Sequence, residues 1–347
     1  WESSDITPRE GDVFQERLYC IRWIETIIKP DGTTREVKHY RAPTPEDQRR
    51  EEMVLALLKE RFVGWQEKGF IPSRRIETGY NNAQPIRERG WTHWHHLFTP
   101  RQLLNIGLLS NYIQTFSNDK IIQIALLLSV GRCVNWNSKL CIWNSDAANE
   151  KTEQTFTNQA LNTLNNFGIR TTLSLRTTWF TKVSNVEVAN NSIVQVRDAR
   201  SIDVSSDIWI TDPPYADSVN YEEISEFTLA WYEGWMKILF PDWYADAKRA
   251  LAIKGNDANF RRSMYEGYKQ ITACMNISGF HLVMFTHQNA GVWADLTLIL
   301  WAAGLRVTAA WTIATEIGSG LKSGNYVQGT VLLVLRKRIQ TEPVFLD

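Results

Sequence analysis

The chain has 347 residues, 44% of them hydrophobic, and its 38 Lys and Arg residues are balanced by 38 Asp and Glu residues. It is long enough for one large or two ordinary globular domains. The zero net charge excludes the bulk basic signature of a small DNA-binding module, although local patches remain compatible with nucleic acid. Four cysteines without a C-x-x-C pair argue against a disulfide framework and indicate a reducing, cytoplasmic setting.

No apolar stretch is long enough to cross a bilayer, so no membrane partner is expected. The polar, acidic start at residues 1–5 does not resemble a signal peptide. Since no initiator Met is present, we expect the chain to be a fragment or to lack its first residues.

The first ninety residues predict a module made of a hairpin and a helix. Strands are expected over 18–28 and 33–40, joined by a turn over 30–32. Thr44 is the predicted N-cap of a helix whose apolar residues recur at helical spacing until Gly69. Its other face is charged, as a solvated face usually is.

Residues 91–190 predict a helical module with a possible role in contacting the target. It follows a polar segment over 73–90 that is expected to be a loop. Helices are predicted over 100–116, 119–134 and 152–166. These modules would precede or be inserted into a third region.

Two polar groups in the middle module leave alternatives open. His93, His95 and His96 suggest a metal site, but no cysteine or carboxylate lies at ligand spacing, so packing or nucleic-acid contact is favoured. Arg101 and Gln102 follow a predicted N-cap, where they are expected either to meet phosphate and base edges or to be ordinary surface residues.

From about residue 190, strands and helices alternate, which predicts an α/β fold over 191–347 with a mostly parallel sheet covered on both faces. The last two strands lack an intervening helix and should form an antiparallel pair at one edge. The expected strands are 192–196, 207–211, 281–286, 305–313 and 327–336, and the expected helices are 222–239, 259–277 and 290–303.

The tetrapeptide Asp212-Pro213-Pro214-Tyr215 directly follows a predicted buried strand. Ligands of open α/β sheets bind at the carboxyl ends of strands. The prolines fix φ and stiffen the loop, so the Asp212 carboxylate and the Pro213 carbonyl can accept hydrogen bonds from both N–H groups of an exocyclic amine. Such acceptors free the nitrogen lone pair for attack on a methyl group, and Tyr215 offers a flat face to an extruded base. The alternative is a structural turn at a strand end.

The tetrapeptide resembles the [DNS]-P-P-[YFW] motif of amino-methyltransferases. Residues 212–221, followed by Glu222, Glu223, Phe227 and Trp231, resemble the large adenine-specific DNA methyltransferases of antiphage islands, and so do 97–103, 137–143 and the hairpin region 17–40. The resemblance extends over most of the chain. It implies a Rossmann-like methyltransferase sheet, S-adenosylmethionine as cofactor, a flipped adenine in DNA as substrate, and a role in restriction-modification or antiviral defence.

The resemblance also implies roles for single residues. Val196-Arg197-Asp198-Ala199 is similar to a strand end whose acidic residue contacts the cofactor adenine, and the equal alternative is that Asp198 caps a turn. Tyr215 would contact the cofactor as well as the base. The expected catalytic residues are Asp212, Pro213, Pro214 and Tyr215, and the expected substrate contacts are Asp217, Asn220, Tyr221, His287 and Arg101.

The sequence departs from this family at one important place. The family has a Gly-rich loop after its first strand, where the backbone approaches the cofactor, and the chain has only Gly318-Ser319-Gly320 between its last two predicted strands. Three interpretations therefore stay open. The chain is a complete adenine-N6 methyltransferase, or a nucleic-acid-binding half-enzyme whose cofactor loop lies on an upstream segment or a partner chain, or an RNA guanine-N2 methyltransferase.

Overall fold

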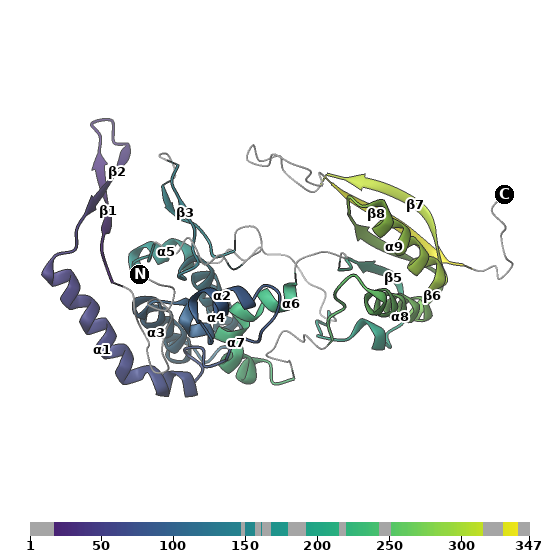
Figure 1. The fold of residues 1–347 in the computed structure, drawn as a ribbon, viewed down its shortest axis with the longest axis horizontal. Helices are drawn as coiled ribbons and strands as arrows, with labels where there is room; N and C mark the ends of the chain where they lie inside the picture. Colours follow the sequence, from purple (N-terminus) through teal and green to yellow (C-terminus); the bar gives the residue numbers. More distant parts are fainter. Residues whose placement is uncertain are drawn as a thin grey trace. The chain divides into compact units, whose positions relative to one another are not determined.

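The computed structural model describes residues 17–146, 150–156, 161, 168–179, 192–214, 220–242, 251–314 and 329–338. The chain divides into two compact units (Figure 1). Unit 1 comprises Trp1–Ser192 and Tyr221–Ala247, and unit 2 comprises Ile193–Asn220 and Lys248–Asp347. The whole is a mixed α/β protein. Among the described residues, no helix is both long and apolar enough to span a membrane.

Unit 1 begins with the predicted hairpin and helix. Strands β1 (Ile21–Ile28) and β2 (Thr34–Arg41) pair antiparallel along their full length. Helix α1 (Pro45–Glu67) starts at a capping box, in which Thr44 Oγ1 accepts a hydrogen bond from the Asp47 amide at 3.3 Å and the Asp47 carboxylate accepts from the Thr44 amide at 2.9 Å. These contacts satisfy amide groups that a helix start leaves unpaired.

Two predictions for the middle of unit 1 are wrong. The segment predicted as a loop contains a short helix, α2 (Ala83–Arg89), which ends at Gly90 with a φ of 63°. The start of the helix predicted over 152–166 is instead strand β4 (Lys151–Thr152), paired with β3 (Trp143–Asn144), and most of that range lies outside the described residues. The loop was predicted from a polar composition interrupted by glycine and proline, although Pro85 lies in the first turn of α2, where proline is tolerated. At Thr152, strand pairing overrode helical spacing.

The remaining helices of unit 1 follow their predicted starts. After the short η2 (Trp94–Leu97), helix α3 (Pro100–Phe116) begins at the Thr99 cap, and α4 (Lys120–Trp136) begins at Asp119. The predicted helix 222–239 is divided at Ser225 into α6 (Tyr221–Ile224) and α7 (Glu226–Leu239). Helix α5 (Thr172–Trp179) was not predicted.

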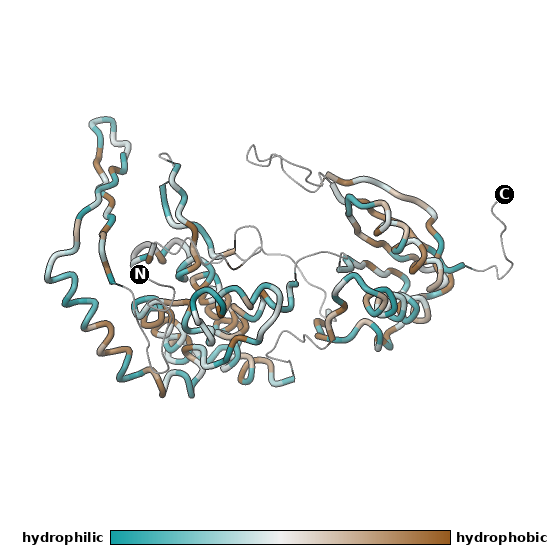
Figure 2. Tube along the Cα trace, viewed as in Figure 1, coloured by the Kyte–Doolittle hydropathy of each residue, from teal (hydrophilic) through white to brown (hydrophobic). Residues whose placement is uncertain are grey.

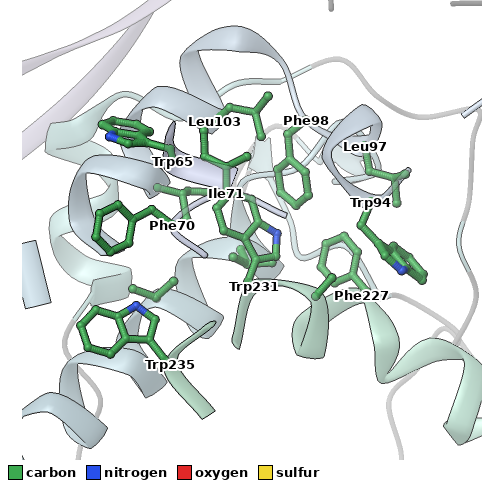
Figure 3. Packing of buried hydrophobic residues seen from close by; sticks show 14 of the residues in the cluster. Trp65, Phe70, Ile71, Trp94, Leu97, Phe98, Leu103, Phe227, Trp231 and Trp235 are labelled. Atoms are coloured by element: carbon green, nitrogen blue, oxygen red, sulfur yellow. The ribbon is translucent and has the colours of Figure 1, made fainter. Parts of the chain in front are cut away.

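One aromatic core holds unit 1 together (Figure 3). It takes side chains from α1, from the turn around Trp94, from α3 and from α7. Phe98 lies at its centre, stacked on Phe227 at 5.5 Å between ring centroids and edge-on to Trp231 at 5.0 Å. Because the first and the second predicted modules share this core with α7, they fold as one body.

Unit 2 is built on a four-stranded sheet in the order β5-β6-β8-β7. Strand β5 (Ser206–Thr211) runs parallel to β6 (Met275–Phe285), and helix α8 (Ala258–Cys274) makes the crossover between them. Helix α9 (Ala290–Ala302) leads to β7 (Leu305–Ile313), and β8 (Thr330–Lys337) returns antiparallel between β6 and β7. The expected antiparallel pair is confirmed at this edge of a mixed, rather than mostly parallel, sheet.

Two strand predictions in unit 2 need correction. Residues 192–196 form no strand, and the side chains of Ile193, Val194 and Val196 are exposed. Helix α8 ends earlier than predicted, because β6 begins at Met275 and runs through Gly279. A side chain at Gly279 would come within 2.7 Å of the Asp207 carbonyl on β5, so this glycine permits close approach of two strands instead of ending a helix.

Only one face of this sheet is covered among the described residues. Helices α8 and α9 pack their apolar sides on Val283, Phe285 and Leu335. On the opposite face the strands are also apolar, and Ile210 and Trp311 there are 62% and 56% exposed. Strands that are apolar on both faces are typical of sheets covered on both sides, so the sequence of unit 2 is suited to a second covering layer.

Candidate functional site

The step Asp212-Pro213-Pro214 lies where the sequence predicted, immediately after the last residue of β5. The strand is anchored by its parallel register with β6, in which Thr211 lies beside Val283. The Asp212 side chain is exposed, and the two prolines are half-buried. An accessible carboxylate on a proline-stiffened step can accept hydrogen bonds from a polar N–H ligand.

A buried polar network lies directly behind this step. Thr211 Oγ1 and His281 Nε2 are 2.9 Å apart, and the ring of His281 lies 5.5 Å from that of Tyr268 on α8. Burial lowers the pKa of His281 to about 4, so the imidazole is neutral near pH 7. Burial also raises the pKa of Tyr268, and the neighbouring Asp212 carboxylate adds to this effect.

Sequence reasoning missed these supporting residues. His281 and Tyr268 are buried, and each has a polar atom, Nδ1 and Oη respectively, without a hydrogen-bond partner of normal geometry among the described residues. A signal for His281 was present, since it interrupts the apolar run Phe280–Phe285 of β6. Tyr268 gave no such signal, because an aromatic residue at helical spacing is typical of a core. The contact between Thr211 and His281, with Tyr268 packed beside the imidazole, anchors the end of β5 next to Asp212.

His287 follows β6 at the same end of the sheet as Asp212, because β5 and β6 are parallel. Its Nδ1 accepts a hydrogen bond from the Asn289 amide at 2.9 Å, and its carbonyl accepts from Trp293 Nε1 at 2.9 Å. These bonds fix the turn that leads into α9. The structure thus gives His287 a local structural role, and its contact with substrate stays a prediction.

Asp198 is engaged by its own turn. Its carboxylate accepts hydrogen bonds from the Arg200 amide at 2.9 Å and from the Arg200 guanidinium at 2.8–3.1 Å through both oxygens. Arg200 lowers the pKa of Asp198. Asp198 therefore caps a turn in the structure, and its role in cofactor binding stays a prediction.

The expected site residues between 215 and 221 do not all lie in one described part of the chain. Tyr215 and Asp217 lie outside the described residues. Asn220 belongs to unit 2, whereas Tyr221 opens α6 in unit 1 with a 62% exposed side chain.

Helix α6 is anchored by Glu223, which follows the expected substrate contacts in the sequence. Its carboxylate accepts hydrogen bonds from the amides of Tyr80 at 3.0 Å and Asn81 at 2.7 Å. The side chain of Glu223 is buried. These bonds attach the segment after Asn220 to the loop before α2.

Arg101 and Gln102 have structural partners at the start of α3. Arg101 pairs with Glu51 of α1 through Nε at 2.8 Å and through Nη2. Gln102 is buried, and its Oε1 accepts from the Thr99 amide at 2.9 Å, which completes a capping box. In the structure Arg101 joins two helices, and its contact with DNA stays a prediction.

The three histidines of the middle module pack against each other with centroids 4.4–5.3 Å apart. Burial lowers the pKa of His95 to about 3 and that of His96 to about 4. No group of three or more His, Cys, Asp or Glu side chains among the described residues is arranged to hold a metal ion. The three rings pack on one another, and contact of the cluster with nucleic acid stays a prediction.

Comparison with known proteins provides no relative for the chain: no protein-family model, curated protein or solved structure matches it.

Proposed function

We propose that the chain carries the base-binding part of an S-adenosylmethionine-dependent methyltransferase that acts on N6 of adenine in DNA. The observation that carries the proposal is the place of Asp212-Pro213-Pro214, at the carboxyl end of a strand that is joined to a parallel neighbour by a crossover helix. That place is where open α/β sheets, Rossmann-like ones included, bind ligands. The resemblance described above supplies the reaction.

In this proposal the residues act on the amine of an extruded adenine. The Asp212 carboxylate accepts a hydrogen bond from one N–H, and the Pro213 carbonyl accepts from the other, which localises the nitrogen lone pair. Tyr215 stacks on the base. The network of Thr211, His281 and Tyr268 holds the step in position, so these are positioning residues.

The described residues do not provide a complete cradle for the cofactor. Both carboxylate oxygens of Asp198 bond to Arg200, and the sequence has no Gly-rich turn between a strand and a helix. We therefore propose that a second segment, upstream or on a partner chain, supplies that loop. No step of the transfer is assigned to the described residues beyond binding and orienting the base.

The sheet of unit 2 supports such a second segment. Among the described residues β5 pairs only with β6, so its other side is an open edge. Ile208 and Ile210 of β5 are 51% and 62% exposed. Soluble proteins usually protect apolar edge strands. A segment with a strand and a glycine-rich loop would pair with this edge and bring its loop toward Asp212 if it ran parallel to β5.

Mass spectrometry of methylated bases in DNA and RNA from cells that express the chain tests the reaction. We expect N6-methyladenine in DNA with the wild-type chain and its loss with Asp212→Ala, provided that the chain suffices alone. Calorimetry with S-adenosylmethionine on the purified chain shows whether the chain alone binds the cofactor.

No binding of S-adenosylmethionine in the calorimetry supports the half-enzyme form, and the expression experiment is then repeated with the second segment present. Methylated guanine in RNA would support the RNA alternative. Binding of the cofactor without methylation of any base would overturn the proposal, and so would full activity of the Asp212→Ala variant.

A further inference from the structure

The β1–β2 hairpin extends beyond the helices of unit 1 (Figure 1). Each strand has 8 residues, which gives the ribbon a length of about 26 Å. Every residue from 23 to 36 is exposed. A two-stranded hairpin without a core is at best marginally stable. A segment that buries nothing of its own over this length is suited to an external partner.

The hairpin is nevertheless held firmly at its base and along its length. At the base, Arg22 Nη2 donates to the Glu150 carbonyl at 2.7 Å, and Arg41 pairs with Asp47 at 2.7 Å. Along the ribbon, Trp23 stacks on His39 with 4.1 Å between centroids. These contacts attach the hairpin to the rest of unit 1, and we call residues 17–41 the arm. A partner would therefore bind a ribbon that is already formed.

The arm is locally basic although the chain is neutral. Residues 17–41 contain six Lys and Arg residues and three Asp and Glu residues, namely Arg17, Arg22, Lys29, Arg35, Lys38 and Arg41 against Glu25, Asp31 and Glu36. Two of the acidic groups are already engaged, Glu25 by His39 at 2.9 Å and Asp31 by Thr33 at 2.6 Å. Lys29 and Arg35 pair with no carboxylate among the described residues. The excess positive charge comes from Arg17, Arg22, Lys38 and Arg41 toward the base of the arm, and Lys29 and Arg35 place two further cations near the tip beside Asp31 and Glu36.

Cationic and aromatic side chains share one face of the arm. Trp23 lies opposite His39, and Ile27 lies opposite Arg35, and directly opposite residues of an antiparallel pair point to the same face. By strand alternation the same face also carries Lys29 and Glu25, whose carboxylate lies 2.9 Å from His39 Nε2. The turn is hydrophilic and the hydrophobic residues lie below it (Figure 2). The face thus combines cations for phosphates with flat and apolar side chains for bases.

We propose that the β1–β2 arm binds duplex DNA as a two-stranded ribbon in the major groove. That groove is about 12 Å wide and accepts such a ribbon, whereas the deep, narrow groove of double-stranded RNA does not. Lys29 and Arg35 contact phosphates, while Trp23 and Ile27 face the groove. The proposal rests on the proposed function in taking DNA as the partner, and it assigns the contact to the arm.

Binding of the full chain to a fluorescent duplex of mixed sequence, measured by anisotropy without cofactor, tests the arm. The variant K29Q/R35Q removes two exposed cations whose side chains make no hydrogen bond or ion pair with the described residues. Each phosphate contact contributes about 0.9 to the slope of log affinity against log salt. We expect the slope to fall by about 1.8 and the affinity near 0.1 M salt to fall at least about tenfold.

The variant K59Q/R306Q is the matched control, since it removes two exposed cations outside the arm that pair with no carboxylate among the described residues. It should leave slope and affinity unchanged, and circular dichroism should show both variants folded. A wild-type slope and affinity in K29Q/R35Q would overturn the proposal. So would a wild-type chain that binds no duplex, and exposed Ile27 and Ile28 would then indicate a protein partner.

Failure of the arm and failure of the proposed function are distinguishable. A chain that binds DNA through the arm but methylates no base contradicts the proposed function alone. A chain that methylates DNA while K29Q/R35Q binds normally contradicts the arm alone.

Discussion

At the scale of single residues, the end of β5 depends on one buried contact between Thr211 and His281. Their Oγ1 and Nε2 atoms are 2.9 Å apart in a site that excludes water from the imidazole. Since Nδ1 of His281 already lacks a partner among the described residues, loss of the Nε2 contact would leave the ring without any hydrogen bond. The contact therefore links the stability of unit 2 to the position of Asp212.

Replacing Thr211 by Val should destabilise unit 2 by about 1–3 kcal/mol, because it leaves a buried ring nitrogen unsatisfied. Thr211→Ser keeps the hydroxyl and should cost clearly less. Urea denaturation of both variants measures the difference. Equal destabilisation by Val and Ser would show that the methyl group, and not the hydrogen bond, matters.

The buried histidines of unit 1 predict acid sensitivity. The pKa values of His95 and His96 fall from 6.5 to about 3 and about 4, mainly through burial and with help from neighbouring positive charge. Above pH 6.5 the two histidines are neutral in both the folded and the unfolded state, so they add no pH dependence to the stability of unit 1. As the pH falls from 6.5 toward 4, the unfolded histidines take up protons that the folded ones do not, so each lowers stability by about 1.4 kcal/mol per pH unit.

The variant His96→Gln should therefore reduce the pH dependence of unit 1 stability by about 1.4 kcal/mol per pH unit between pH 6 and pH 5. Urea denaturation at both pH values measures it. His39, which is half-buried and lies 2.9 Å from Glu25, offers a control, since its replacement removes no fully buried ring. An unchanged pH slope in His96→Gln would mean that His96 is protonated in the folded state.

At the scale of elements, the end of α1 and helix α7 meet through two glycines. A side-chain carbon at Gly234 would come within 2.8 Å of Gly69 Cα, and one at Gly69 would come within 2.6 Å of Gly234 Cα. Gly69 also has a φ of 73°, which other residues rarely adopt. Backbone therefore packs on backbone here, and neither glycine has room for a side chain.

Gly234→Ala should destabilise unit 1 by about 1–3 kcal/mol or more, because the obstacle is backbone that cannot rotate away. Gly64→Ala is the matched control in α1, where an added carbon meets nothing within 4 Å. That change should stabilise the helix by up to about 1 kcal/mol. Thermal unfolding of the two variants should shift in opposite directions, and a shift in the same direction would contradict the close approach.

Local signals explain which elements the sequence predicted. Thr44 and Thr99 are N-caps in the structure, as the proline that directly follows each of them indicated. The strands of unit 2 from β5 onward were found from apolar runs, but the segment around Val194 was wrongly predicted as a strand because propensity alone cannot supply a pairing partner. Pairing and register are long-range properties that one sequence does not specify.

The candidate site was predicted only in its local part. The step at Asp212 follows a strand as expected, since a proline pair after an apolar run is a local signal. Its support by Tyr268 and His281 was not predictable, because it depends on how α8 and β6 meet behind β5. The turn at Asp198 is the opposite case, because its partner is local. Arg200, which pairs with the Asp198 carboxylate, lies only two residues later in the sequence.

At the scale of the whole molecule, the uncovered face of the unit 2 sheet predicts how substitutions there behave. Ile210 on that face is 62% exposed, whereas Val283 on the face below α8 and α9 is fully buried. In the chain alone, Ile210→Lys should change the free energy of unfolding by less than about 0.5 kcal/mol. Val283→Lys should prevent folding of unit 2, because it buries an unpaired charge.

Self-association provides the second measurement on this face. An open apolar edge is a template for pairing with another strand, so the wild-type chain should associate with rising concentration and Ile210→Lys should associate less in analytical ultracentrifugation. If a second segment completes the sheet, the same substitution should abolish its binding while leaving the Asp212 step intact. Unfolding of unit 2 by Ile210→Lys would instead show that this face is covered in solution by the chain itself, and the need for a second segment would then disappear.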